Sequence, residues 1–175
     1  AGSYFTNPSG HLGPIASAAY GGALARPNER IIATTGDGDF IMGNPASVLW
    51  TCSHHHIPVL YIVLNNACWG IEWFLLQDTT LKLAKGFKDY EFVDIDEPRV
   101  NFSEMARSFG VHSDVIESPD EAGEVLEKAV SVVWRGEPAL IDVHLKKYTE
   151  GKSSYSFVFK RPIEVREGVI ELTHN

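Results

Sequence analysis

The sequence has few of the residues that mark specialised classes of protein. Its two cysteines, Cys52 and Cys68, are too few and too loosely spaced for a disulfide framework or a zinc site, which favours a reducing, cytoplasmic setting. No apolar run approaches the roughly 18–20 residues of a membrane span. No signal-peptide pattern opens the chain. We therefore expect a cytoplasmic protein that does not enter a membrane.

Positive charge is also scarce. The chain has 15 Lys and Arg against 23 Asp and Glu, for a net charge of -8. Binding to a nucleic-acid backbone needs a basic surface, so nucleic acid is not expected as a partner. The 175 residues, 44% of them hydrophobic, suffice for one domain with a sizeable core. Because the chain begins at Ala1 and not at Met, we expect a processed subunit or a piece of a longer polypeptide.

Strand-like and helix-like patterns alternate along the chain. Helical patterns cover residues 15–25, 45–55, 67–77, 101–110 and 118–134, and strand-like apolar runs cover 31–36, 57–66, 111–116 and 138–145. This order, with short connections, predicts an α/β fold in which a parallel sheet has helices on both faces. We assign residues 1–147 to this domain and residues 148–175 to a polar C-terminal tail.

Polar residues follow the first two predicted strands. The stretch "TTGDGDFIMG" places Asp37 after one strand, and Asn65 and Asn66 end the next. Ligands of parallel sheets bind outside the carboxyl ends of the strands, and a carboxylate with an amide oxygen suits Mg²⁺. Gly36 and Gly38 let the backbone approach a phosphate, and the helix after Asn66 offers N–H groups to the same anion. These residues predict a clamp for Mg²⁺ and a diphosphate.

The two motifs also resemble those of a known family. "GDGDF" and "NN", with 26 residues between Gly38 and Asn65, resemble the paired motif of thiamine diphosphate enzymes. "GHLGPIASAAYGGALARPNERIIATTGDGDF" and "LWTCSHHHIPVLYIVLNN" are similar to the diphosphate-binding domain of the acetolactate synthase, benzoylformate decarboxylase and pyruvate decarboxylase superfamily, with 2-hydroxyacyl-CoA lyases as a further branch. The resemblance runs from about Pro8 to about Leu145 and implies the thiamine diphosphate-binding fold.

The resemblance implies a set of ligands for thiamine diphosphate and Mg²⁺. Asp37 and Asn66 would give side-chain oxygens to Mg²⁺, and Cys68 its carbonyl oxygen. Gly38 and Asp39 would direct N–H groups at the diphosphate, while Leu12 would support the bent cofactor and the backbone of Gly10 and Leu12 would hold its aminopyrimidine. The implied cofactor-binding residues are Gly10, His11, Leu12, Gly36, Gly38, Asp39, Phe40, Asn66, Cys68, Trp69, Gly70 and Ile71.

A catalytic acid is implied six residues beyond Asn66. In the pyruvate decarboxylase branch a glutamate at the place of Glu72 protonates the reaction intermediate, so the resemblance implies that role here. A solvated helix face is the simpler interpretation of the same residue. Trp69 and Trp73, four residues apart, either shape the substrate pocket or pack as helix neighbours. Three consecutive histidines, 54–56, would point in different directions at a helix end, which argues against a metal site.

Two departures from the family pattern lie beside the predicted metal site. Asp39 stands where many relatives carry a small polar residue, and it adds negative charge near a diphosphate. Its side chain must therefore point away or help bind the metal. The connection "FIMGNPASVLW" is also about two residues longer than in those relatives.

The activating glutamate of the superfamily has no counterpart in this sequence. It comes from a pyrimidine-binding domain, so we expect a partner domain or subunit, in a hetero- or homo-oligomer that acts on a small-molecule substrate. A decarboxylase or lyase is favoured by Glu72, and an acetolactate synthase-like carboligase is the alternative. A non-catalytic module that binds Mg²⁺ and a nucleotide also fits the motifs. A regulatory subunit without cofactor is disfavoured, because every type of metal ligand is present.

Overall fold

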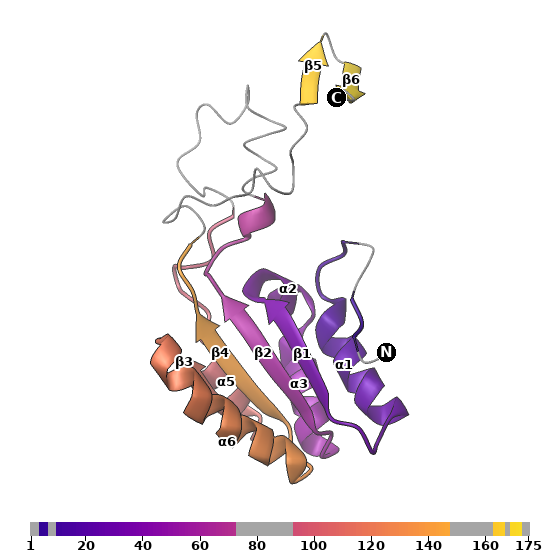
Figure 1. The fold of residues 1–175 in the computed structure, drawn as a ribbon, viewed down its shortest axis with the longest axis vertical. Helices are drawn as coiled ribbons and strands as arrows, with labels where there is room; N and C mark the ends of the chain where they lie inside the picture. The colour runs from indigo at the N-terminus through magenta and orange to yellow at the C-terminus, as the bar shows by residue number, and fades with distance from the viewer. Residues whose placement is uncertain (1–3, 7–9, 73–92, 148–162, 167–168, 173–175) are drawn as a thin grey trace.

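A four-stranded parallel sheet forms the centre of the molecule (Figure 1). The computed structural model describes residues 4–6, 10–72, 93–147, 163–166 and 169–172. The strand order is β1-β2-β4-β3, with β1 at Ile31–Gly36, β2 at Val59–Asn65, β4 at Ala139–His144 and β3 at His112–Ile116. The four strands match the four predicted ones, and β1 and β2, which precede the two polar motifs, are direct neighbours.

Helices cover both faces of this sheet. They are α1 at Pro14–Ala25, α2 at Asp37–Met42, α3 at Pro45–His54, α5 at Phe102–Ser108 and α6 at Ala122–Trp134. Side chains of α1, α3 and α5 share one buried cluster with Tyr61 and Val63, whereas α6 packs with Leu60 and Ile141 on the other face. The predicted α/β architecture with two covered faces is confirmed.

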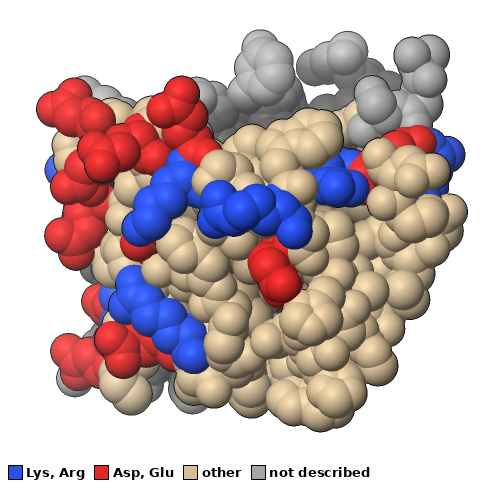
Figure 2. Space-filling view, turned by 90° about the horizontal axis from the view of Figure 1, so that it is seen from below, with Lys and Arg blue, Asp and Glu red and all other residues tan. Residues whose placement is uncertain are grey.

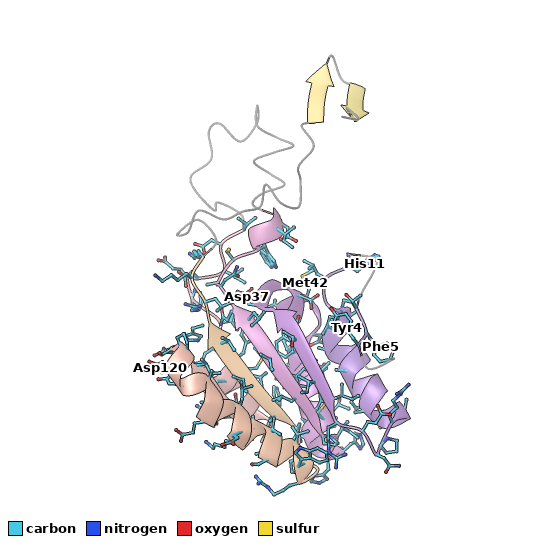
Figure 3. The ribbon with its side chains drawn as sticks, viewed as in Figure 1. Tyr4, Phe5, His11, Asp37, Met42 and Asp120 are labelled. Atoms are coloured by element: carbon cyan, nitrogen blue, oxygen red, sulfur yellow. The ribbon has the colours of Figure 1, made fainter. Side chains whose placement is uncertain are left out.

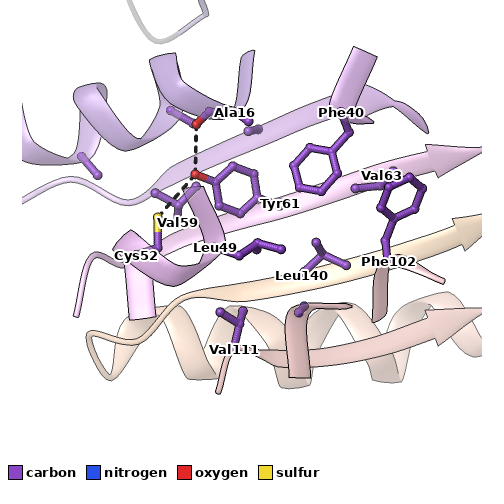
Figure 4. Close-up of a cluster of buried hydrophobic side chains, with 14 residues drawn as sticks. Ala16, Phe40, Leu49, Cys52, Val59, Tyr61, Val63, Phe102, Val111 and Leu140 are labelled. Atoms are coloured by element: carbon purple, nitrogen blue, oxygen red, sulfur yellow. Dashed lines mark hydrogen bonds between the residues drawn. The ribbon is translucent and has the colours of Figure 1, made fainter. Parts of the chain in front are cut away.

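The core on the α1 side is built from small residues on the helix and aromatic residues beneath it (Figure 4). Ala16, Ala19 and Ala23 of α1 are all buried, and their short side chains let the helix lie close to the sheet. The Tyr61 hydroxyl donates a hydrogen bond to the Ala16 carbonyl oxygen at 3.0 Å. Phe40 of α2 enters the same cluster, with its ring centroid 5.5 Å from that of Phe102. The segment that carries Asp37 is thereby anchored in the core.

Two segments differ from the sequence-based expectation. The "GDGDF" stretch is a short helix, α2, and not a simple turn. Its first turn contains Asp37 and Asp39, which are favourable next to the positive end of a helix dipole. The predicted polar tail includes two antiparallel strands, β5 at Ile163–Arg166 and β6 at Val169–Leu172. The helix expected over residues 118–134 first makes a 3₁₀ turn, Pro119–Glu121, which Ser118 caps.

The surface at the amino ends of the strands carries charges of both signs. Figure 2 views this end and shows Lys and Arg across the middle of the face, with Asp and Glu gathered along one side. Within the described residues, every helix is too short or too polar to cross a lipid bilayer.

Replacing Tyr61 with phenylalanine tests the link between α1 and the sheet. Tyr61→Phe keeps the buried ring but removes the hydroxyl that donates to the Ala16 carbonyl oxygen. We expect the free energy of unfolding to fall by about 1–2 kcal/mol, measured by urea denaturation. Tyr4→Phe is the matched control, because Tyr4 is exposed, and it should change stability by less than about 0.5 kcal/mol. Equal stability of the two variants would contradict this account of the core.

Candidate functional site

The two polar motifs meet at the carboxyl end of the sheet. Gly36, the last residue of β1, is in register with Leu64 of β2, so Asp37 and Asn66 follow neighbouring strand ends. Figure 3 shows Asp37 at this end of the molecule, with Met42 and His11 nearby at the same end. The parallel pairing therefore brings together the residues that the sequence placed 29 positions apart.

A carboxylate, an amide and a carbonyl group converge there. One terminal atom of the Asn66 amide lies 3.1 Å from Oδ1 of Asp37 and 2.8 Å from the carbonyl oxygen of Cys68. Magnesium binds oxygen at about 2.0–2.1 Å, so neighbouring oxygens of an octahedral shell lie about 2.9 Å apart. With the amide oxygen at that position, the two separations match such a shell. Asp37, Asn66 and Cys68 are the three residues that the family resemblance implies as metal ligands.

The Asn66 amide can take two orientations with different consequences. With nitrogen in place of oxygen, it would donate hydrogen bonds to both Asp37 and Cys68. With oxygen there, it accepts the Cys68 N–H at 3.3 Å but leaves three oxygens together, an arrangement that a cation would stabilise. A half-turn of one side chain therefore separates an internally bonded site from one ready for a metal. The residues fit a hard divalent ion.

Asp37 lies in an environment that needs a positive charge. Only 3% of the residue is exposed, and this burial raises the pKa of its carboxyl group. The backbone N–H of Gly38, 2.9 Å from Oδ1, opposes that rise, as do the N–H of Ala67 and the charge of Arg99. A divalent ion would supply the remaining compensation that a buried carboxylate requires. In the described residues, no cluster of three His, Cys, Asp or Glu offers another metal site, the three histidines included.

A buried polar network holds the Asn66 loop from the other side. Asn65 Nδ2 donates to Oδ1 of Asp142 at 3.0 Å, and the Phe102 N–H donates to Oδ2 at the same distance. Arg99 donates to the Asn65 carbonyl oxygen at 2.7 Å. Asp142 is fully buried, and sequence reasoning did not select it, although a lone acid in the apolar run "ALIDVH" was a usable signal. Arg99 carried no such signal.

Trp69 lies directly against the metal-binding turn. A Cβ atom at Gly38 would come within 2.0 Å of the Trp69 ring, so only glycine fits beneath the indole. Trp69 also packs with Cys68 and Val93, which supports the packing interpretation of this residue. Its indole nitrogen is buried and has no hydrogen-bond partner among the residues that the structure describes. That N–H is a donor available beside the site, which the sequence did not predict.

The remaining predicted residues lie on the same side of the sheet or at its edge. Gly70, Ile71 and Glu72 are helical, and Glu72 is partly buried, whereas Trp73 lies outside the described residues. In the loop before α1, Leu12 is 43% exposed, and Gly10 has a φ of 70° that favours glycine. Leu12 is therefore not a core residue. Gly36 is extended at the start of α2, and His11 is exposed in the same loop as Leu12.

Asp39 does not face the converging oxygens. Its Oδ1 accepts a hydrogen bond from the Gly13 N–H at 2.6 Å, and its Oδ2 accepts one from the Thr35 hydroxyl. Both carboxylate oxygens are thus engaged by the loop before α1 and by β1. Of the two possibilities left open by the sequence, the side chain points away from the metal site.

Comparison with known proteins identifies the family. The family model for the C-terminal thiamine pyrophosphate-binding domain of thiamine pyrophosphate enzymes matches residues 2–143. The chain belongs to this family. The thiamine pyrophosphate-binding domain is similar in structure to the thiamine diphosphate-dependent 4-hydroxybenzoylformate decarboxylase of Rhodococcus jostii, with a TM-score of 0.69 and 28% identity over 83% of this chain and 25% of that one.

Sequence relatives of this thiamine pyrophosphate-binding domain carry different names. Benzoylformate decarboxylase of Pseudomonas aeruginosa is 30% identical over 81% of this chain and 24% of its own length. A probable acetolactate synthase large subunit of Methanocaldococcus jannaschii is 34% identical over 77% of this chain and 21% of its own length. Sulfoacetaldehyde acetyltransferase of Castellaniella defragrans is 29% identical over 63% and 17%. The chain thus spans about a quarter or less of these relatives.

Removing the charge of Asp142 tests the network that supports the Asn66 loop. In Asp142→Asn one of the two buried donors, Asn65 Nδ2 or the Phe102 N–H, would face an amide NH₂ group. We expect the free energy of unfolding to fall by about 1.5–3 kcal/mol in urea denaturation. Glu127→Gln, an exposed position on α6, serves as the control and should stay within about 0.5 kcal/mol of wild type. If Asp142→Asn had the same free energy of unfolding as the wild type, the network would not contribute to the stability of the fold.

Proposed function

We propose that the chain is the Mg²⁺- and diphosphate-binding part of a thiamine diphosphate-dependent lyase that acts on a 2-oxo acid or a 2-hydroxyacyl substrate, including CoA thioesters. The observation that carries this proposal is the meeting of the Asp37 carboxylate, the Asn66 amide and the Cys68 carbonyl at separations that suit a magnesium shell when the amide presents its oxygen. Membership of the thiamine pyrophosphate enzyme family supports the identity of the cofactor. The bound cofactor supplies the carbanion chemistry that breaks or forms a C–C bond beside a carbonyl group.

The residues of this chain would bind and orient the cofactor at its diphosphate end. Asp37, Asn66 and the Cys68 carbonyl would hold Mg²⁺, which in turn binds phosphate oxygens. The first turn of α2 and the unpaired Trp69 indole N–H would donate to the diphosphate. The loop with Gly10, His11 and Leu12 would contact the other half of the cofactor. The exposed side chain of Leu12 is available for that contact.

The whole enzyme requires a second unit. The chain spans about a quarter of its relatives, and the activating glutamate expected for this chemistry has no candidate in the sequence. We propose that a pyrimidine-binding domain, in the same polypeptide or in a partner subunit, supplies this glutamate and the rest of the substrate pocket within an oligomer. Cys52 and Cys68 are buried and form no disulfide among the described residues, which supports the proposal of a cytoplasmic location.

Two other functions are distinguished by specific observations. Similarity to an acetolactate synthase subunit, at 34% identity, favours an acetolactate synthase-like carboligase as the second candidate. Glu72, the proposed proton donor six residues beyond Asn66, favours the decarboxylase or lyase instead. A non-catalytic module for Mg²⁺ and nucleotides would prefer ATP or NAD over thiamine diphosphate in a direct binding measurement.

Substitution of Asp37 tests the metal site. In Asp37→Ala the only carboxylate of the three-oxygen set is lost, so Mg²⁺-dependent binding of thiamine diphosphate should weaken at least about 100-fold. The measurement is isothermal calorimetry on the polypeptide that carries this chain, together with its partner, with and without EDTA. Glu127→Gln is the matched control and should bind normally. Undiminished, Mg²⁺-dependent binding by Asp37→Ala would refute the proposed metal site.

Substitution of Glu72 tests the proposed proton transfer. Glu72→Gln keeps the size of the side chain but removes the acid, so product release should slow by about 10²–10⁴-fold while thiamine diphosphate affinity stays within about twofold. Steady-state turnover of a 2-oxo acid and calorimetry of cofactor binding measure the two effects separately. Equal turnover in mutant and wild type would exclude Glu72 from the mechanism.

A further inference from the structure

We propose that Asp39 is a positioning residue that fixes the Gly10–Gly13 loop to the metal-binding turn, so that the two ends of the bound cofactor are held at a set separation. The inference rests on the proposed function for its ligand. The linkage itself is a property of the folded chain. It gives a role to the residue that departs from the family pattern in this sequence.

The carboxylate of Asp39 joins three elements. Oδ1 accepts the Gly13 N–H at 2.6 Å, which ties α2 to the loop before α1. Oδ2 accepts the hydroxyl of Thr35, which is buried at the end of β1. The two partners lie 22 residues apart in the sequence, and one side chain satisfies both. Hydrogen bonds to a carboxylate are about twice as strong as neutral ones, so the link is a firm one.

Close backbone packing adds a second link between the same two segments. A Cβ atom at Gly13 would lie 2.9 Å from the backbone of Met42, and one at Gly43 would lie 2.5 Å from the Gly13 carbonyl oxygen. Gly13 also has a φ of 101°, in the region that favours glycine. The loop therefore touches α2 near its beginning, through Asp39, and just beyond its end, at Gly43. It cannot shift along α2 without losing one of these contacts.

The helix transmits this constraint to the metal ligand. Asp37 and Asp39 lie in the same turn of α2, and Phe40 anchors that turn in the core. A displacement of the Gly10–Gly13 loop would therefore act on the turn that carries Asp37. In the proposed complex this loop contacts the aminopyrimidine end, and Asp37 contacts the diphosphate end through Mg²⁺. Asp39 would set the distance between those two contacts.

Two substitutions separate hydrogen bonding from charge. Asparagine at position 39 can still accept the Gly13 N–H, and its NH₂ group can donate to the Thr35 hydroxyl oxygen. Alanine removes both links. We expect Asp39→Asn to behave nearly as wild type and Asp39→Ala to release the loop. If the negative charge were the functional feature, both variants would behave alike.

The affinities for two ligands of different length test whether Asp39 sets the distance between the aminopyrimidine contact and the diphosphate contact. For Asp39→Ala, affinity for thiamine diphosphate with Mg²⁺ should fall about tenfold, the scale of one lost hydrogen bond to a charged group. Affinity for inorganic pyrophosphate with Mg²⁺, which reaches only one end of the site, should stay within about twofold of wild type. An equal loss of affinity for both ligands in Asp39→Ala would mean that Asp39 supports only the metal-binding turn. Tighter binding of both ligands would mean that the Asp39 carboxylate repels phosphate in the wild type. Either result overturns the proposal.

Amide hydrogen exchange tests the linkage without any ligand. In the polypeptide that carries this chain, the segment around Gly13 should exchange about tenfold faster in Asp39→Ala than in wild type or Asp39→Asn, while β2 stays unchanged. Unchanged exchange around Gly13 would refute the linkage. The two proposals can fail separately. If the wild type bound pyrophosphate but did not prefer thiamine diphosphate, the proposed function would be wrong. The hydrogen-exchange result would still test the role of Asp39, because it needs no ligand.

Discussion

The approach of the Asn66 amide to the Asp37 carboxylate and the Cys68 carbonyl is the interaction on which the site depends. Phe40 holds the Asp37 turn in the core, and the Asn65–Asp142 pair holds the following strand end. These contacts keep the carboxylate, the amide and the carbonyl close together. The Asn66 amide can bond the other two groups through its nitrogen, or it can present its oxygen, in which case a divalent ion would offset the repulsion among three oxygens.

The parallel sheet decides which side chains can take part. Because β1 and β2 are paired in register, their carboxyl ends lie side by side, and each releases its chain into a turn at the same edge. Ala67, with a φ of 55°, turns the backbone sharply after Asn66, so that Cys68 can present its carbonyl oxygen to the Asn66 amide. Strand pairing and one strained residue thus account for the geometry of the ligand set.

The sequence predicts the strands and the polar turns after them because the patterns that indicate them lie within a few neighbouring residues. The aliphatic runs that became β1 and β2, and the Gly, Asp and Asn residues after them, were sufficient to predict the fold and the meeting of Asp37 with Asn66 at one edge of the sheet. The ligand role of Cys68 came from the family resemblance and stays a prediction. The helical state of α2 was missed because Gly36, directly before it, and Gly38, within it, are typical of turns, whereas its core anchor, Phe40, acts through contacts distant in sequence. Asp142 and the partners of Asp39 were missed for the same reason. Each depends on a hydrogen bond between residues 26 to 77 positions apart in the sequence, which no periodicity records.

The position of the buried polar contacts bears on what this domain has in common with its relatives. Relatives named for decarboxylation, for acetolactate synthesis and for acetyl transfer all match this chain at similar identity, so the matched region contains what those reactions share. The structure is consistent with this, because the Asp37 carboxylate, the Asn66 amide and the Cys68 carbonyl meet at the proposed metal and diphosphate site. Glu72 and Leu12 are both partly exposed. On the proposed function, residues of the second unit would therefore meet these side chains and make the choice among substrates, and this domain would constrain that choice through the position in which it holds the cofactor.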